Sequence, residues 1–524
     1  MEAFIIALQQ TFSPLAILMV VTGTMIGTIL GALPGLGSIV GISICLPFTY
    51  TMGSVPAIAL LLGVYAGSIY GGSISSVLIN TPGTPQSAAT ALEGYPMALA
   101  GKAGEAIGWA TMASVIGGLF SCLILLIAAP QLAKAASKFG AVEMFALIFL
   151  GISCISTLSS GSKFKGIFSG LAGLALAIVG QDPITGEMRF TFDIFALMSG
   201  FDLIPIVVGA FAIGEILTRV DAISRSEKVN PIKCTRMILP GWKKFKGRGW
   251  QALKSSIIGA GIGILPGAGA TAAAFISYGE ARRSSPNKEN FGNGEPDGII
   301  APEAANNAVT GGALVPSLAL GLPGDAVTAI MLATLILHGI VPGARLMQDS
   351  PSTVYAAILT LSLANLLLIP CGIVVMRAFS RLLRMPEQLF LPSICLLCLL
   401  GAYAARMNTV DFYITFLAGF MGITFRYFSI PVAPMVIGLV LGFQFEFSLR
   451  QSLILTDGSV SRMFTDHPIA AGLFALTFII QAGPYLSRKI FARNGRDAAE
   501  TMETENSATI NAVEAAATSR SGNS

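Results

Sequence analysis

The sequence predicts an all-α polytopic membrane protein built from two corresponding halves. Of its 524 residues, 53% are hydrophobic and 11% are charged, and the mean hydropathy is +0.74. Soluble domains carry about 25% charged residues, so this composition is typical of a chain that crosses a membrane many times. One glycine-proline phrase occurs twice, as GALPGLG at residues 31–37 and GILPGAG at residues 263–269. Because both copies interrupt apolar stretches, they predict a broken membrane helix in each half.

The apolar runs set the expected number of helices. A helix needs about 20 apolar residues to cross the hydrocarbon, and several runs here are shorter, so we expect about 12 transmembrane helices plus re-entrant or broken helices. The runs lie at residues 12–31, 55–79, 105–129, 141–160, 166–181, 196–217, 255–276, 300–322, 325–342, 352–376, 388–404, 409–425, 430–447 and 468–487, with a shorter one at 39–51.

Two polar regions set the domain boundaries. Residues 218–254 are strongly basic, and the positive-inside rule places them in the cytoplasm. Residues 488–524 become rich in Ala, Ser, Thr, Glu and Asn, a composition that does not form a core. The expected organisation is a first transmembrane half at 1–217, a basic cytoplasmic loop at 218–254, a second transmembrane half at 255–487, and a disordered cytoplasmic tail at 488–524.

Further phrases repeat at similar offsets. YGGS (70–73) and NTPGT (80–84) in the first half correspond to TGGA (310–313) and GLPGD (321–325) in the second. The LPG copies are 232 positions apart, the Gly-Gly pairs 240 and the Pro-Gly pairs 241. The polar stretch RRSSPNKENFGNGEPDG supplies the extra residues of the second copy.

Counting spans from the basic loop gives the two halves opposite orientations. After its Pro-Gly motif, the first half reaches a loop at 95–104 on the cytoplasmic side, whereas the second reaches a loop at 343–351 on the outer side. The sequence thus predicts two inverted repeats. Inverted repeats with interrupted helices in corresponding places are the signature of a secondary transporter, with the binding site at the interruptions.

The broken segments supply the candidate site. A new helix start offers unpaired N–H groups and a dipole that favour an anion, and irregular backbone at membrane depth must line a cavity or lie inside the protein. Glycines allow close approach of the backbone, and Asn and Thr side chains hydrogen-bond carboxylates. The predicted substrate-binding residues are Gly35, Gly37, Asn80, Thr81, Gly83, Thr84, Gly267, Gly269, Asn306 and Gly324.

Asp325 is the predicted coupling-ion residue, because an acid at membrane depth is costly and usually functional. The alternative interpretation is structural: Thr84 and Asp325 both follow Pro-Gly and are good N-cap residues for the helices after them. Glu303 lies in APEAANNA, at an expected membrane edge, and its role stays open between the two interpretations.

Several function classes are disfavoured. The chain has two histidines, too few for the usual catalytic metal ligands, so no metal site is predicted. It has no G-x-x-x-x-G-K-[ST] phosphate loop and no arrangement for nucleophilic catalysis, so we expect neither an ATPase nor another enzyme, and no cofactor. No cationic aromatic stretch indicates nucleic acid, so the expected surroundings are a lipid bilayer.

Long stretches of the sequence resemble the large membrane subunit of the bacterial tripartite tricarboxylate transporter family. The likeness covers the chain to about residue 487, and Glu93 stands where the family commonly has Asp. The strings that carry it are GALPGLG (31–37), YAGSIYGGSISSVLINTPGTPQSAATALEGYPMALAGKAGEA (65–106), GILPGAGATAAAFISYGEARR (263–283), APEAANNAVTGGALVPSLALGLPGDAVTAIMLATL (301–335) and HGIVPGARL (338–346).

The resemblance implies a multi-pass permease of the bacterial inner membrane. A periplasmic substrate-binding protein would capture a carboxylate such as citrate and deliver it to this subunit and a small four-helix membrane subunit. A sodium or proton gradient, rather than ATP, would drive import of the di- or tricarboxylate. The alternative is a stand-alone carboxylate carrier or channel that needs no binding protein.

Overall fold

The computed structural model describes residues 2–154, 162–182, 184–223, 236–265, 269–343, 345–382 and 387–479, together with residues 232, 234 and 481. The described chain is helical apart from one short antiparallel hairpin, formed by β1 (Gly180–Gln181) and β2 (Met188–Arg189), in which Gly180 lies opposite Arg189. The basic segment contributes the short helix α11, and α12 begins before its expected end. The predicted tail at 488–524 lies outside the described residues.

The helices of the first half are α1 (Glu2–Thr11), α2 (Pro14–Ala32), α3 (Gly37–Thr49), α4 (Ser54–Ile79), η1 (Pro85–Ser87), α5 (Ala88–Met97), η2 (Ala98–Lys102), α6 (Ala103–Ala136), α7 (Ala141–Cys154), α8 (Lys163–Ala177), η4 (Phe195–Leu197), α9 (Leu203–Val207), η5 (Val208–Ile213) and α10 (Gly214–Ile223).

The helices that follow are α11 (Trp242–Lys246), α12 (Gly249–Ile264), α13 (Ala270–Ser284), η6 (Lys288–Asn290), α14 (Asp297–Leu320), α15 (Ala326–Leu337), α16 (Leu346–Asp349), α17 (Pro351–Leu382), α18 (Glu387–Arg406), α19 (Thr409–Tyr427), α20 (Ala433–Leu455) and α21 (Val460–Thr465).

Five helical segments of the described chain are long and apolar enough to cross a membrane. They are Pro14–Ala32, Ser54–Ile79, Pro85–Ala136, Pro351–Phe379 and Ala433–Leu455. Shorter apolar helices include Gly37–Thr49 and Ala326–Leu337, which directly follow the predicted breaks. A multi-pass membrane protein with broken helices accounts for this mixture of lengths.

Glycines let α2 and α4 pack backbone against backbone. A Cβ added to Gly27 would lie 2.4 Å from the Val64 carbonyl oxygen, and one added to Gly31 would lie 2.1 Å from that of Ser68. Only glycine fits at such a distance, and small residues of this kind are the usual means of close packing between membrane helices.

The second half repeats this packing between α12 and α14. A Cβ on Gly259 would lie 2.1 Å from the Ala305 carbonyl oxygen, and one on Gly263 would lie 2.8 Å from that of Val309. These glycines lie 232 positions after Gly27 and Gly31, and their partners lie 241 positions after Val64 and Ser68. The two helix pairs therefore pack in the same register.

The packing corrects the sequence offset of the Gly-Gly pairs by one residue. Gly71 faces Thr28 and Gly31 on α2, and Gly312, rather than Gly311, faces the corresponding Ala260 and Gly263 on α12. Gly311 instead faces Ser121 on α6. The offset is thus 241 throughout α4 and α14, because the relevant glycine in each half is the one that faces the partner helix.

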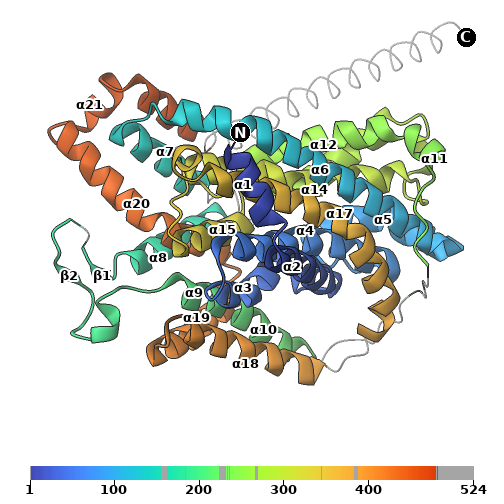
Figure 1. Cartoon of the computed structure of the whole chain (residues 1–524), viewed down its shortest axis with the longest axis horizontal. Coiled ribbons are helices and arrows are strands. Elements are labelled where there is room, and N and C mark those ends of the chain that lie inside the picture. Colours follow the sequence, from blue (N-terminus) through green and yellow to red (C-terminus); the bar gives the residue numbers. More distant parts are fainter. Residues whose placement is uncertain are drawn as a thin grey trace, which may run out of the picture.

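Corresponding elements of each half also contact the other half. Helix α3, which follows the first LPG phrase, packs on α15 of the second half, and α13, which follows the second, packs on η1 and α5 of the first. Likewise α8 packs on α20, and η5 packs on α19. In Figure 1, α2, α4, α14 and α15 lie near the centre, whereas α20 and α21 lie at the left edge and α18 and α19 at the lower edge.

Candidate functional site

The first Pro-Gly break lies between α4 and η1. Helix α4 ends at Asn80, which has the left-handed conformation with φ of 52°, and Pro82 and Gly83 then lead into η1 and α5. A Cβ on Gly83 would lie 3.0 Å from the Gly72 Cα atom and would also collide with the Gly31 carbonyl oxygen. Because Gly31 opens GALPGLG, the two breaks of the first half are in direct contact.

The second Pro-Gly break, between α14 and α15, has the same construction. Helix α14 ends at Gly321, also left-handed with φ of 72°, and a Cβ on Gly324 would lie 2.7 Å from the Ala313 Cα atom. Ala313 lies 241 positions after Gly72, as Gly324 does after Gly83. The backbone at the two breaks therefore follows the same path, and glycine is required where the chain passes the helix it has just left.

Asp325 caps the helix that follows the second break. Its Oδ1 accepts the backbone N–H of Thr328 at 2.7 Å, and the Thr328 hydroxyl accepts the backbone N–H of Asp325 at 2.9 Å. Its Oδ2 accepts the hydroxyl of Tyr65, on α4 of the other half, at 2.6 Å. Both carboxylate oxygens of Asp325 thus have partners within the protein, so the N-cap interpretation of this residue is correct.

At the first break, the side chains at the corresponding positions have unpaired polar atoms. Thr84 corresponds to Asp325, and Asn306 corresponds to Tyr65, each at an offset of 241. Thr84 is the N-cap of η1, and the Ser87 hydroxyl accepts its backbone N–H at 3.3 Å, as Thr328 does for Asp325. However, Thr84 Oγ1, both amide atoms of Asn306 and the Oδ1 of neighbouring Asn307 are buried without a hydrogen-bond partner. Thr84, directly before η1, is 2% exposed, and Asn306 and Asn307 on α14 are fully buried. Helices η1 and α14 contact each other.

Unpaired polar groups at this burial identify the first break as the candidate ligand site. A buried donor or acceptor without a partner costs about 1–3 kcal/mol, so native proteins rarely keep one without a role. A hydroxyl and an amide N–H both donate to carboxylate oxygens, and the start of the helical segment formed by η1 and α5 favours negative charge. The arrangement suits a carboxylate anion.

The LPG breaks place their glycines at helix starts. Gly35 has φ of 82° and Gly37 has φ of 56°, between α2 and α3, and Gly269 has φ of 77° directly before α13. A Cβ on Gly37 or on Gly269 would meet no atom within 4 Å. Glycine is therefore needed at these positions for the positive φ angle rather than for close packing. Gly267 lies outside the described residues.

Glu303, which the sequence placed at a membrane edge, is buried in the protein core. Its side chain is fully buried on α14, where Thr90 of α5 donates to Oε1 and Ser114 of α6 donates to Oε2 at 3.0 Å. Helix α14 begins at Asp297 and is buried from Gly298 onward, so Glu303 is enclosed by other helices although it lies only six residues after the helix start.

Glu93, also fully buried, holds the polar loop that distinguishes the second half. Its two carboxylate oxygens accept backbone N–H groups from Gly292, Gly294 and Glu295, and the Tyr278 hydroxyl at 2.8 Å. Three backbone donors on one carboxylate fix the loop against α5.

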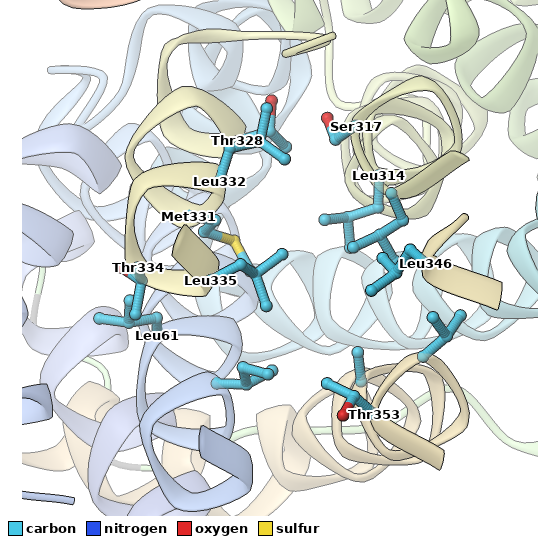
Figure 2. A pocket seen from close by; sticks show the side chains of 14 residues that line it. Leu61, Leu314, Ser317, Thr328, Met331, Leu332, Thr334, Leu335, Leu346 and Thr353 are labelled. Atoms are coloured by element: carbon cyan, nitrogen blue, oxygen red, sulfur yellow. The ribbon is translucent and has the colours of Figure 1, made fainter. Parts of the chain in front are cut away.

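A small apolar cavity of about 20 Å³ lies beside the second break, between α4, α14, α15, α16 and α17. Figure 2 shows Thr328 and Ser317 facing each other at one end, and Leu332, Met331, Leu335, Leu314 and Leu346 around the rest. Ser317 accepts the Gly324 N–H at 3.3 Å, so Ser317 and Thr328, two of the four polar residues that line the cavity, brace the break. The walls are too apolar and the space too small for a tricarboxylate in this conformation.

The predicted residues therefore fall into distinct groups. Gly83, Thr84 and Asn306 are buried near the first break, Asn80 is exposed at the end of α4, and Thr81 is half-buried and donates to the Ile79 carbonyl at 3.2 Å. Gly324 and Asp325 form the second break. Tyr65 was missed from sequence, although its offset of 241 from Asn306 marks it. Among the described residues, no group of three or more His, Cys, Asp or Glu side chains is placed to hold a metal ion.

Comparison with known proteins identifies the family. The model of the tripartite tricarboxylate transporter TctA family matches residues 17–437. This chain belongs to the TctA family. The match takes in both LPG phrases, both Pro-Gly breaks and Glu303, so the chain is a membrane transport subunit of a tripartite system, as the resemblance implied.

Two curated relatives of this TctA-family chain come from Agrobacterium vitis. An uncharacterized 52.8 kDa protein in the TAR-I ttuC' 3' region is 35% identical over 468 residues, which is 89% of this chain and 93% of the relative. An uncharacterized protein in the TAR-II ttuC' 3' region is 32% identical over 221 residues, 42% of this chain and 91% of that relative. No solved structure matches the chain.

Proposed function

We propose that this chain is the permease subunit of a secondary transporter that imports di- or tricarboxylates of the citrate kind across the bacterial inner membrane. In this proposal a periplasmic binding protein delivers the substrate, a small four-helix membrane subunit completes the complex, and a sodium or proton gradient drives uptake. The observation that carries it is the set of buried, unpaired hydroxyl and amide groups of Thr84 and Asn306 at the first break of a TctA-family chain.

The two breaks would have different tasks. At the first, Thr84 and Asn306 offer donors to a substrate carboxylate, and the adjoining helix start adds a favourable dipole. At the second, the Asp325 carboxyl group is already hydrogen-bonded to Tyr65 and Thr328, which closes this break without a ligand.

The reciprocal contacts between the halves suit alternating access. We infer that the halves are inverted repeats, since α3 packs on α15 while α13 packs on η1 and α5. A movement that opens one break to one side of the membrane would then close the other, as in transporters whose repeats move around a central site. The outer helices α18, α19 and α20 would supply the partner surface against which the central helices move.

Uptake into proteoliposomes tests the proposal. The vesicles hold this chain and its small membrane partner, and labelled citrate and other di- and tricarboxylates are offered under an inward sodium or proton gradient, with and without the binding protein. Uptake that needs both the gradient and the binding protein supports the proposal. Uptake with the gradient alone would instead establish a stand-alone carrier, and equilibration without any gradient would establish a channel.

A further inference from the structure

Glu303 is a buried carboxylate that the substrate site does not use. Four helices enclose it: α14 carries it, Thr90 of α5 and Ser114 of α6 donate hydrogen bonds to it, and Ser73 of α4 lies nearby with its hydroxyl unpaired. Among the described residues, no Lys, Arg or His forms an ion pair with Glu303. Tyr70 of α4 is a titratable neighbour that interacts with Glu303, and in the described part of the chain no hydrogen bond or ion pair joins the Glu303 carboxyl group to a titratable side chain of α5, α6, α12 or α13.

The surroundings suit a carboxyl group that changes protonation state. An ionised carboxylate buried without a cation is costly, because the protein interior does not replace its hydration. Arg or Lys would hold Glu303 permanently ionised, whereas hydroxyls serve both states, since they donate to the carboxylate and accept from the protonated acid. Thr90 and Ser114 already lie at hydrogen-bond distance from Oε1 and Oε2, which leaves a proton rather than a larger ion as the fitting occupant.

The position of Glu303 links it to the first break. Asn306 lies one helical turn further along α14, about 4.5 Å along the helix axis. Ser73 follows Gly72, whose Cα faces the Thr84 hydroxyl: a Cβ there would lie 2.5 Å from Thr84 Oγ1. Helices α4 and α14 therefore each connect the carboxyl group to one of the two unpaired groups of the proposed substrate site.

We propose that Glu303 binds the proton that is transported together with the substrate. This inference rests on the proposed function and names its coupling ion and the residue that carries it, in place of Asp325. A substrate anion beside Asn306 disfavours a second negative charge one turn away, so substrate binding promotes protonation of Glu303, and protonation promotes substrate binding in return. Release of both to the cytoplasm completes the step with the carboxylate restored.

Infrared difference spectroscopy tests the protonation directly and does not depend on transport. The wild-type complex is reconstituted in nanodiscs and titrated with acid, and the C=O stretching band of a protonated carboxyl group is followed. We expect one band component that is missing from Glu303→Gln and present in Asp325→Asn and in the surface control Glu289→Gln. A wild-type and Glu303→Gln pair with identical titrations would overturn the proposal.

Uptake experiments then test the coupling. An inward proton gradient without sodium should accelerate wild-type uptake about tenfold, within the usual range of coupling between sites. Glu303→Gln, a neutral mimic of the protonated acid, should lose this stimulation and keep substrate exchange, whereas Asp325→Asn and Glu289→Gln should keep the stimulation. Stimulation retained in Glu303→Gln, or wild-type uptake driven by sodium alone, contradicts the inference. Wild-type vesicles with neither uptake nor exchange would count against the proposed function, and the infrared titration then decides the inference by itself.

Discussion

At the scale of single residues, corresponding side chains in the two halves differ in whether they are hydrogen-bonded. Tyr65 and Asp325 form a closed pair at 2.6 Å, whereas Asn306 and Thr84, each 241 positions away from the residue it corresponds to, leave their polar atoms unpaired. The Tyr65–Asp325 hydrogen bond stabilises the second break without a ligand. The unpaired groups of Thr84 and Asn306 lower the stability of the protein until a ligand binds them. Binding sites commonly reduce stability in this way.

Asn306→Leu should separate stability from transport. The substitution removes a buried amide that makes no hydrogen bond, and such a group costs about 1–3 kcal/mol. We expect a melting temperature in detergent that does not fall, and carboxylate uptake reduced at least about tenfold, the equivalent of 1.4 kcal/mol of lost binding.

Ser317→Ala is the matched control for that prediction. Ser317 donates to the Ala313 carbonyl at 2.6 Å and accepts from the Gly324 N–H at 3.3 Å, so its loss leaves a buried N–H unpaired and should lower the melting temperature. If Asn306→Leu destabilised the protein as much as Ser317→Ala, the amide would have to be structural.

Sequence alone finds only part of this site. Thr84 and Asp325 can be predicted because Pro-Gly marks the break and the next residue caps a helix. Tyr65 and Thr90 cannot be found in this way, because their partners lie 260 and 213 residues away and no local pattern announces the contact. The same limit applies to Glu303, whose depth depends on three helices packed around it.

At the scale of helices, glycines decide which surfaces meet. The repeated phrases are visible in sequence, but the correct offset of 241 for α4 and α14 follows only from which glycine faces the partner helix. Helix boundaries near the breaks were predictable from Gly and Pro. The contacts of α3 with α15, and of α13 with η1 and α5, were not predictable, because they join residues far apart in the sequence.

Gly259→Ala should impair folding, and Gly261→Ala in the same helix should not. A Cβ on Gly259 would lie 2.1 Å from the Ala305 carbonyl oxygen, so α12 and α14 would have to separate, at a cost of about 1–3 kcal/mol or more. A Cβ on Gly261 meets nothing within 4 Å, and alanine is the better helix former by about 0.5–1 kcal/mol. Yield of monodisperse protein and melting temperature measure both; equal effects would refute the packing argument.

Glu93→Gln should release the loop that carries η6. The carboxylate accepts three backbone N–H groups, and hydrogen bonds to a charged group contribute about 1.5–3 kcal/mol each. Glutamine keeps one oxygen and presents an NH2 group to donors. We expect faster cleavage by a lysine-specific protease after the exposed Lys288. Tyr278→Phe removes only one bond to Glu93 and should show intermediate cleavage; unchanged rates in both variants would show that other contacts hold the loop.

At the scale of the whole molecule, ion pairs join the β1–β2 hairpin of the first half to α20 of the second. Asp182 pairs with Arg189 at 3.4 Å and with Arg450 at 3.0 Å, and both arginines also reach Glu446. Composition predicted a helical, multi-pass membrane protein correctly. These long-range pairs, like the buried ones, lie beyond what composition and periodicity can indicate.

The Asp182 pairs should make stability depend on acid. Backbone N–H groups of Ile184 and Thr185, with Arg450 and Arg189, lower the pKa of Asp182 from 3.8 to about 2. The folded state thus holds the proton more weakly than the unfolded state, so the stabilisation is complete above about pH 4 and is lost as the pH falls toward 2.

Melting temperatures measured across this pH range test the claim. Asp182→Asn should melt below wild type at neutral pH, and the difference should shrink as the pH falls. Asp457→Asn is the control, because Asp457 is 80% exposed and its pair with Arg462 contributes little. A difference between Asp182→Asn and wild type that stays constant with pH would show that the ionised carboxylate is not what stabilises the hairpin.

The central claim is that a carboxylate binds at the first break, between Thr84 and Asn306. An experimental structure of the complex with the di- or tricarboxylate that the uptake panel selects tests it most directly. The account predicts density for the anion within hydrogen-bond distance of the Thr84 hydroxyl and the Asn306 amide, with the Tyr65–Asp325 pair intact at the second break. Density at the second break beside Thr328 and Ser317, with Asn306 still unpaired, would contradict it.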